Sequence, residues 1–198
     1  MSTHLYLVRH GETVLNKSGV YYGATDCSLS DEGVFQVQEL SNILRDSIDI
    51  IISSPLSRAL ETAMLISKQS KEKLVIDEGL REIDFGLWEG MNYKEISTLY
   101  EQEWNSWIED WINVSPPNGE SFISQYHRVS RSLKNILNEY KDKKIMIVSH
   151  QGCLRIIASI LLNMEERGYW NFTFEHGAYS LFEIVDEHLT IRKINCKG

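Results

Sequence analysis

Two apolar runs of this chain each end in a histidine, and this pattern constrains the fold more than any other feature. Residues 4–8 are followed by Arg9-His10-Gly11, and residues 144–149 are followed by His150-Gln151-Gly152. Short apolar runs of this kind are typical of buried strands. In an open α/β sheet, ligands bind at the carboxyl ends of the strands. Both histidines are therefore predicted to lie at ligand-binding strand ends, with glycines that let a ligand approach the backbone.

The residue types at these strand ends suit a phosphoryl group. A histidine can attack an electrophile, and the guanidinium group of Arg9 offers a planar fork of donors that fits a phosphate. A further segment, residues 50–63, is predicted to be a strand and then a helix, with Ser54 as its N-cap and Pro55 at its first position. Arg58 falls in the first turn of that helix, where the helix dipole disfavours a cation. Its position indicates a bound anion.

A carboxyl group in the segment 80–90 is the candidate proton donor. Glu82 lies among apolar and aromatic residues in the sequence, and such surroundings suit a carboxyl group to protonating a leaving group. A single glutamate in a loop is more often a solvated surface residue. The combination with the two histidines and two arginines favours the catalytic interpretation.

Together these segments resemble the histidine phosphatase superfamily, the phosphoglycerate mutase-like group, over nearly the whole chain. The resemblance is carried by Leu-Val-Arg-His-Gly-Glu-Thr at 7–13, Ser-Ser-Pro-Leu-Ser-Arg-Ala at 53–59, Glu-Ile-Asp-Phe-Gly at 82–86 and Val-Ser-His-Gln-Gly at 148–152. It implies that His10 is the nucleophile that becomes phosphorylated and that Glu82 is the proton donor. The side chains that it assigns to the phosphoryl oxygens are Arg9, Arg58 and His150.

The resemblance also implies substrate contacts beyond this catalytic set. Asn16, Gly23 and Gln151 match positions near the phosphate, whereas Tyr22 stands where many of these phosphatases carry a glutamine. No metal and no cofactor are implied. The carboxylates of the sequence do not gather into an oxygen-rich cluster of the kind that holds Mg²⁺.

The predicted fold is a single α/β domain over residues 1–198, with a mostly parallel sheet flanked by helices. Strands are expected at 4–8, 50–53, 74–77 and 144–149, and helices near 31–44, from 55 onward and near 154–162. The tail alternates polar and apolar residues at 179–184 and 189–194, which predicts a C-terminal β-hairpin at an antiparallel edge. Residues 91–139 have a helical pattern and are predicted to form an inserted lobe over the active site.

Three tryptophans in this lobe leave two interpretations open. Trp104, Trp107 and Trp111 are spaced to share one helical face, and such aromatic stripes are usually core. The alternative is that one of them lines a site for a flat aromatic group. Residues 83–126 hold a single basic side chain, Lys94. A mutase acting on phosphoglycerates needs cations in this region for the second anionic group of its substrate.

Softer features resemble the α-ribazole phosphatases within the superfamily. They lie in residues 21–26, 107–122 and 174–180, and they imply hydrolysis of α-ribazole 5′-phosphate to α-ribazole during assembly of the cobalamin nucleotide loop. A broad-specificity or phosphoserine-type phosphatase is the main alternative, and a phosphoglycerate mutase is less favoured. A non-catalytic binding protein is disfavoured, because the candidate nucleophile, proton donor and second histidine are all present.

Composition limits the classes of molecule that the chain is expected to bind. A formal net charge of −8 disfavours nucleic acids and anionic membranes, which bind basic surfaces, so a small-molecule phosphate ester is the expected partner. The three cysteines (Cys27, Cys153 and Cys196) are odd in number and widely spaced, which indicates neither a disulfide framework nor a zinc cluster. No signal-peptide pattern and no apolar run of membrane-spanning length is found, and a cytoplasmic enzyme is expected.

Overall fold

A six-stranded sheet organises the fold in the computed structural model, which describes residues 2–44, 48–70, 73–186 and 188–197. The strand order is β3-β2-β4-β1-β5-β6. The strands are β1 (Ser2–Arg9), β2 (Ile50–Ser53), β3 (Lys73–Ile76), β4 (Lys144–Ser149), β5 (Tyr179–Val185) and β6 (His188–Cys196). Strands β3, β2, β4 and β1 pair in parallel, whereas β5 pairs antiparallel with both β1 and β6. The predicted parallel sheet with a C-terminal hairpin at its edge is confirmed.

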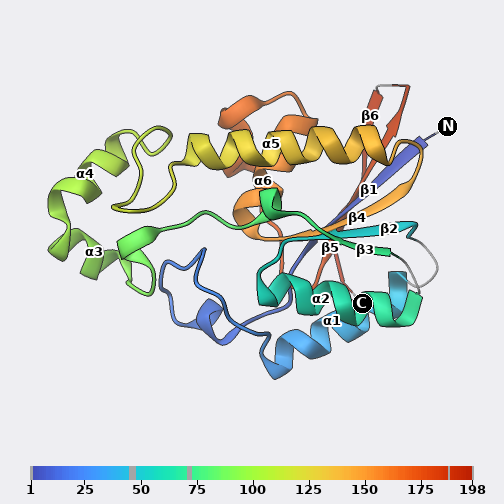
Figure 1. Cartoon of the computed structure of the whole chain (residues 1–198), viewed down its shortest axis with the longest axis horizontal. Helices are drawn as coiled ribbons and strands as arrows, with labels where there is room; N and C mark the ends of the chain where they lie inside the picture. Colours follow the sequence, from blue (N-terminus) through green and yellow to red (C-terminus); the bar gives the residue numbers. More distant parts are fainter. Residues whose placement is uncertain (1, 45–47, 71–72, 187, 198) are drawn as a thin grey trace.

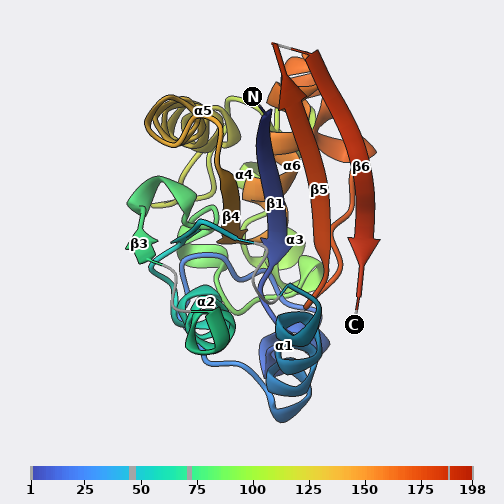
Figure 2. The same cartoon turned by 90° about the vertical axis from the view of Figure 1, so that its right-hand side faces the viewer.

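Helices cover both faces of this sheet (Figures 1 and 2). One layer holds α1 (Asp31–Leu44) and α2 (Ser57–Ser70), and the other holds α5 (Phe122–Glu139) and α6 (Gln151–Leu161). Successive side chains of a strand point to opposite faces. Leu5 and Leu7 of β1 therefore pack with α5 and α6, while Tyr6 and Val8 pack with α1 and α2. Burial on both faces explains why these strands are apolar throughout.

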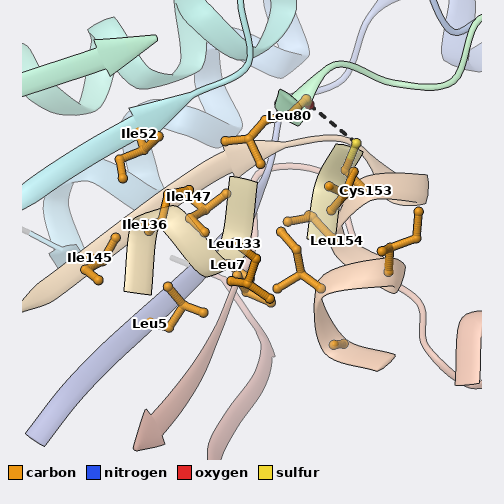
Figure 3. Packing of buried hydrophobic residues seen from close by; sticks show 14 of the residues in the cluster. Leu5, Leu7, Ile52, Leu80, Leu133, Ile136, Ile145, Ile147, Cys153 and Leu154 are labelled. Atoms are coloured by element: carbon orange, nitrogen blue, oxygen red, sulfur yellow. Dashed lines mark hydrogen bonds between the residues drawn. The ribbon is translucent and has the colours of Figure 1, made fainter. Parts of the chain in front are cut away.

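The layer of α5 and α6 also fixes the segment that carries Glu82. Figure 3 shows Leu133 and Ile136 of α5 packed with Leu154 of α6 around the sheet residues, next to Leu80. The Cys153 thiol donates hydrogen bonds to the carbonyl oxygens of Leu80, at 3.4 Å, and Arg81, at 2.8 Å. Burial raises the pKa of this thiol to about 12. The cysteine therefore stays protonated and holds residues 80–81 against the start of α6.

The segment predicted as a lobe divides into two parts. Helices α3 (Tyr93–Leu99) and α4 (Glu101–Glu109) extend beyond one end of the sheet (Figure 1). Helix α5 instead belongs to the layer on the sheet, because Val129, Leu133 and Ile136 lie in the core. The lobe that flanks the active site is thus shorter than the expected span of 91–139.

The N-terminus of α2 differs from its prediction. The helix begins at Ser57, so that Ser54 and Pro55 precede it. The Ser54 hydroxyl does accept the Leu56 N–H at 3.3 Å. However, the cap comes from a loop 31 residues earlier, where the Asp26 carboxylate accepts the Ser57 N–H at 2.8 Å and its hydroxyl at 2.7 Å. Capping by a distant carboxylate fits the preference of helix N-termini for negative charge.

The three tryptophans of the lobe do not share one face. Helix α4 ends at Glu109, so Trp111 lies beyond it. Trp104 and Trp107 stack on each other, with ring centroids 5.5 Å apart. Trp111 packs against Phe122 instead, with ring centroids 4.6 Å apart. The prediction of a single stripe is wrong, because the helical spacing was extended past the end of the helix.

Candidate active site

A cavity of about 280 Å³ lies where the carboxyl ends of β1 and β4 meet the start of α2. Every predicted site residue except Gly23 contributes to its wall. The lining residues are Arg9, His10, Asn16, Gly19, Val20, Tyr21, Tyr22, Arg58, Glu82, Phe85, His150 and Gln151. The fold therefore brings together side chains that are up to 142 positions apart, such as Arg9 and Gln151.

His10 is held with one ring nitrogen free for attack. Its Nδ1 lies 2.8 Å from the carbonyl oxygen of Gly11. Since a carbonyl only accepts, Nδ1 carries the proton and Nε2 has a free lone pair. Burial, with the positive charges of Arg58 and Arg9, lowers the pKa of His10 well below its ordinary value. The ring is therefore a neutral imidazole at pH 7, which is the nucleophilic form.

His150 lies beside His10 on the same wall. The two ring centroids are 5.2 Å apart, and His150 Nε2 is 2.8 Å from the Ser54 hydroxyl. Burial and the charge of Arg58 lower the pKa of His150 as well. Its Nδ1 is buried and has no hydrogen-bond partner within the described part of the chain. A buried polar atom without a partner is costly, and a bound oxyanion would relieve this cost.

The two arginines of the cavity carry uncompensated positive charge. Arg58 donates to the carbonyl oxygens of Thr25, at 2.9 Å, and Gly23, at 2.7 Å. Arg9 donates to the carbonyl oxygen of Phe174 at 2.8 Å. Both Nε atoms lack a partner, and neither guanidinium joins an ion pair with the residues that the structure describes. Two largely buried cations whose hydrogen-bond acceptors are all neutral make a strong anion site.

Glu82 differs from its prediction in its surroundings. Its Oε1 accepts from the Gln125 side-chain nitrogen at 2.8 Å and from the Ile83 N–H at 3.0 Å. Its Oε2 accepts from the Gly152 N–H at 2.9 Å. Hydrogen-bond donors, rather than apolar groups, therefore surround the carboxyl group. Gln125 was not identified as a site residue from the sequence. It is fully buried in α5, and a glutamine among the apolar positions of a helix is a signal that could have pointed to it.

The remaining predicted contacts separate into lining and supporting residues. Asn16 lines the cavity, and its Oδ1 accepts the N–H of Thr13 at 2.8 Å. Gln151 also lines it, and its Oε1 accepts the N–H of Phe174 at 3.0 Å. Gly23 lies behind the wall, where its carbonyl oxygen holds Arg58. Direct contact between Gly23 and a ligand in this cavity is therefore not what the geometry favours.

Tyr22 occupies the position without an assigned role. Its ring lies under the Arg58 guanidinium, with 5.1 Å from Cζ to the centroid, and its hydroxyl is 3.1 Å from the Thr13 hydroxyl. It therefore forms part of the wall beside the cationic end of the cavity.

Among the described residues, no group of three or more His, Cys, Asp or Glu side chains gathers in a way that could hold a metal ion.

Known proteins similar in sequence are phosphatases, as the geometry of the cavity suggests. The family model of the histidine phosphatase superfamily (branch 1) matches residues 5–197, and the chain belongs to this superfamily. The adenosylcobalamin/alpha-ribazole phosphatase of Salmonella typhimurium is 33% identical over 196 residues, which are 98% of this chain and 96% of that protein. Phosphoserine phosphatase 1 of Hydrogenobacter thermophilus is 32% identical over 192 residues, which are 96% and 91% of the two chains.

A solved structure agrees closely in fold. The alpha-ribazole phosphatase of Shigella flexneri superposes with a TM-score of 0.91 at 34% identity, covering 98% of this chain and 96% of that one. The expected superfamily and α/β fold are thus confirmed. The chain is a phosphatase, a hydrolase of phosphate esters. In the described part of the chain, no helix has both the length and the apolar character needed to cross a membrane.

Proposed function

We propose that the chain hydrolyses α-ribazole 5′-phosphate to α-ribazole and inorganic phosphate, through a phosphohistidine formed on His10. Nε2 of His10 attacks phosphorus in line as the bond from phosphorus to the ribose oxygen breaks. Glu82 gives a proton to the departing oxygen. Water then attacks the phosphohistidine while Glu82 takes a proton from it, and the breaking P–N bond returns the neutral histidine.

Three side chains are assigned to stabilise the negative charge that develops on the phosphoryl oxygens. Arg9 and Arg58 line the cavity and bring fixed positive charge to it. His150 lies beside His10, and its Nδ1 has no hydrogen-bond partner within the described residues. Preorganised donors of this kind stabilise a transition state without reorganisation during the reaction.

The preference for α-ribazole phosphate rests on the neutral, aromatic end of the cavity. Beyond the phosphate-binding groups, the wall consists of Gly19, Val20, Tyr21, Tyr22 and Phe85. The cavity's charged side chains are Arg9, Arg58 and Glu82, which the phosphate end already uses. Phosphoserine adds an ammonium and a carboxylate to its phosphate, and a phosphoglycerate adds a carboxylate. A flat, uncharged base matches this wall better than either, because it needs no charged partner.

The lobe tryptophans support this wall from behind. The Tyr21 ring meets Phe85 edge to face at 5.1 Å, and its outer contacts are Trp104 at 6.1 Å and Trp107 at 6.5 Å. Trp104, Trp107 and Trp111 are not among the lining residues. The sequence left open whether a tryptophan lines the site; we assign the aromatic contact to Tyr21 and Phe85, with Trp104 and Trp107 supporting Tyr21.

The test is a comparison of phosphate esters under identical conditions. The value of kcat/KM for α-ribazole 5′-phosphate should exceed those for phosphoserine and 3-phosphoglycerate by about 10² or more, which is about 2.7 kcal/mol of transition-state binding. One aromatic stacking contact and one or two hydrogen bonds supply energy of that order. A flat profile would instead indicate a broad-specificity phosphatase, and a preference for phosphoserine would support the phosphoserine-type alternative.

The expected cytoplasmic location remains a prediction.

A further inference from the structure

Glu89 receives backbone hydrogen bonds from two separate loops. Its Oε1 accepts the N–H groups of Gly23 at 2.9 Å, Ala24 at 3.0 Å and Phe85 at 3.0 Å. Its Oε2 accepts the N–H groups of Gly23 at 3.0 Å and Thr25 at 3.1 Å. Glu89 lies seven positions after Glu82 in the sequence and is absent from the cavity wall.

The charge of Glu89 is maintained by these backbone donors together with the Thr25 side chain. Burial acts to raise its pKa, but the hydrogen bonds from Thr25, Phe85 and Gly23 outweigh that effect and lower it. Glu89 forms no ion pair with the lysines, arginines and histidines of the described segments. The peptide N–H groups and the Thr25 side chain that donate to this half-buried carboxylate are strongly ordered by it, because hydrogen bonds to a charged group are about twice as strong as neutral ones.

One of the peptides that Glu89 binds also holds Arg58. The peptide unit between Gly23 and Ala24 donates its N–H to Glu89 and offers its carbonyl oxygen to Arg58 Nη2 at 2.7 Å. Two residues further, at the end of the same short loop, the carbonyl oxygen of Thr25 accepts from Arg58 Nη1 at 2.9 Å. A peptide bonded on one side to an anion and on the other to a cation is polarised, which strengthens both bonds.

The loop has little freedom to adjust elsewhere. A side-chain carbon at Gly23 would overlap the carbonyl oxygen of Ile83 and would lie 2.9 Å from its carbonyl carbon. On the other side, Asp26 is bonded to the first residue of α2. Glu89 is thus the charged group that sets the orientation of the 23–25 carbonyls toward Arg58.

We propose that Glu89 is a positioning residue for Arg58, acting through the peptides of residues 23–25 so that the guanidinium is preorganised for the phosphoryl group. This inference rests on the proposed role of Arg58 in the reaction. It distinguishes Glu89 from a general staple between two loops, because its effect on catalysis must pass through Arg58.

The first experiment compares Glu89→Gln with Glu61→Gln. Glutamine keeps the size of the side chain but removes the charge and one acceptor oxygen. For Glu89→Gln, kcat/KM for p-nitrophenyl phosphate should fall about tenfold, which is about 1.4 kcal/mol, and the inhibition constant of vanadate should rise by a similar factor. Glu61 accepts a single backbone N–H, that of Leu29 at 3.0 Å, from an adjacent loop. Its substitution should change both values less than about twofold.

A double-mutant cycle with Arg58→Ala makes the test decisive. In the Arg58→Ala background, Glu89→Gln should lower kcat/KM by less than about twofold further. Losses that multiply would show that Glu89 acts independently of Arg58 and would overturn the inference, as would a folded Glu89→Gln protein with full activity. Full activity of Arg58→Ala alone would instead refute the proposed role of Arg58. Thermal melting monitors folding, and Glu89→Asp, with its shorter reach, enters the same cycle if Glu89→Gln does not fold.

Discussion

Substitution of Gly152 by alanine should damage catalysis without damaging the fold. Gly152 lies in the first turn of α6 and donates its N–H to Glu82 Oε2. An added methyl group would overlap Glu82 Oε1 and would lie 3.1 Å from the Glu82 carboxyl carbon and 3.2 Å from Gln125 Nε2. Ordinary contacts between carbon and oxygen are about 3.3–3.6 Å. The carboxyl group must therefore move by roughly 1 Å, since it is the flexible partner.

The expected effect follows from this displacement. A shift of about 1 Å in a catalytic group can cost about 10² in rate, so kcat/KM for an ester with an alkoxide leaving group should fall about 10²-fold in Gly152→Ala. An ester of nitrophenol needs no proton on its leaving group, and its kcat/KM should change only a few-fold. Alanine favours a helix over glycine by up to about 1 kcal/mol, so the melting temperature should stay the same or rise.

Glu82→Gln supplies the reference for this experiment. It should reproduce the selective loss on the alkoxide ester, within the range of about 10²–10⁴ that is typical of general acid catalysis. Adding Gly152→Ala to Glu82→Gln should then change little, because both substitutions remove the same proton transfer. An equal loss on both esters, or an unchanged Gly152→Ala enzyme, would refute the assignment of Glu82 as proton donor.

Two further predictions concern stability and the aromatic wall. A third histidine, His176, lies beside His10, with ring centroids 5.2 Å apart. Burial lowers the pKa of His176 to about 4 and lowers those of His10 and His150, whereas the unfolded histidines take up protons near pH 6.5. The folded chain should therefore lose stability as the pH falls from about 6.5 toward 4. The slope is at most about 1.4 kcal/mol per pH unit for each histidine, and less for the part-exposed His176 because solvent screens it; a melting temperature constant from pH 7.5 to 5 would contradict this. Tyr21→Leu should lower kcat/KM for α-ribazole phosphate about tenfold while leaving that for phosphoserine nearly unchanged, and equal losses on both would argue against an aromatic wall.

The strand ends of the active site could be predicted because their chemistry and their local pattern agree. Each histidine directly follows an apolar run, and in a parallel sheet such ends gather at one edge. Arg58 could be placed in the first turn of its helix for a similar reason, even though the predicted start of that helix was two residues early. The cap from Asp26 depends on tertiary contact, which periodicity does not carry.

The supporting residues could not be predicted, because their roles depend on backbone groups of distant loops. Glu89 binds the loop of residues 23–25, which lies 64 to 66 positions earlier in the chain. Gln125 binds Glu82, which lies 43 positions earlier. The sequence places Glu82 among apolar neighbours, whereas its contacts in space are donors from α5 and α6. Substrate contact by Gly23 stays a prediction; its close approach to Ile83, which leaves no room for a side chain, depends on tertiary packing. Such contacts arise only when the layers pack.

Trapping the phosphorylated enzyme tests the central claim most directly. The native protein is mixed with a substrate carrying a radioactive phosphate, quenched within the first turnover, digested and mapped. The label should be labile in acid and stable in base, as expected of a phosphohistidine, and it should lie on the peptide that contains His10. A folded His10→Ala protein should carry no label and show no turnover. Label on another residue, or appreciable turnover by His10→Ala, would contradict the account.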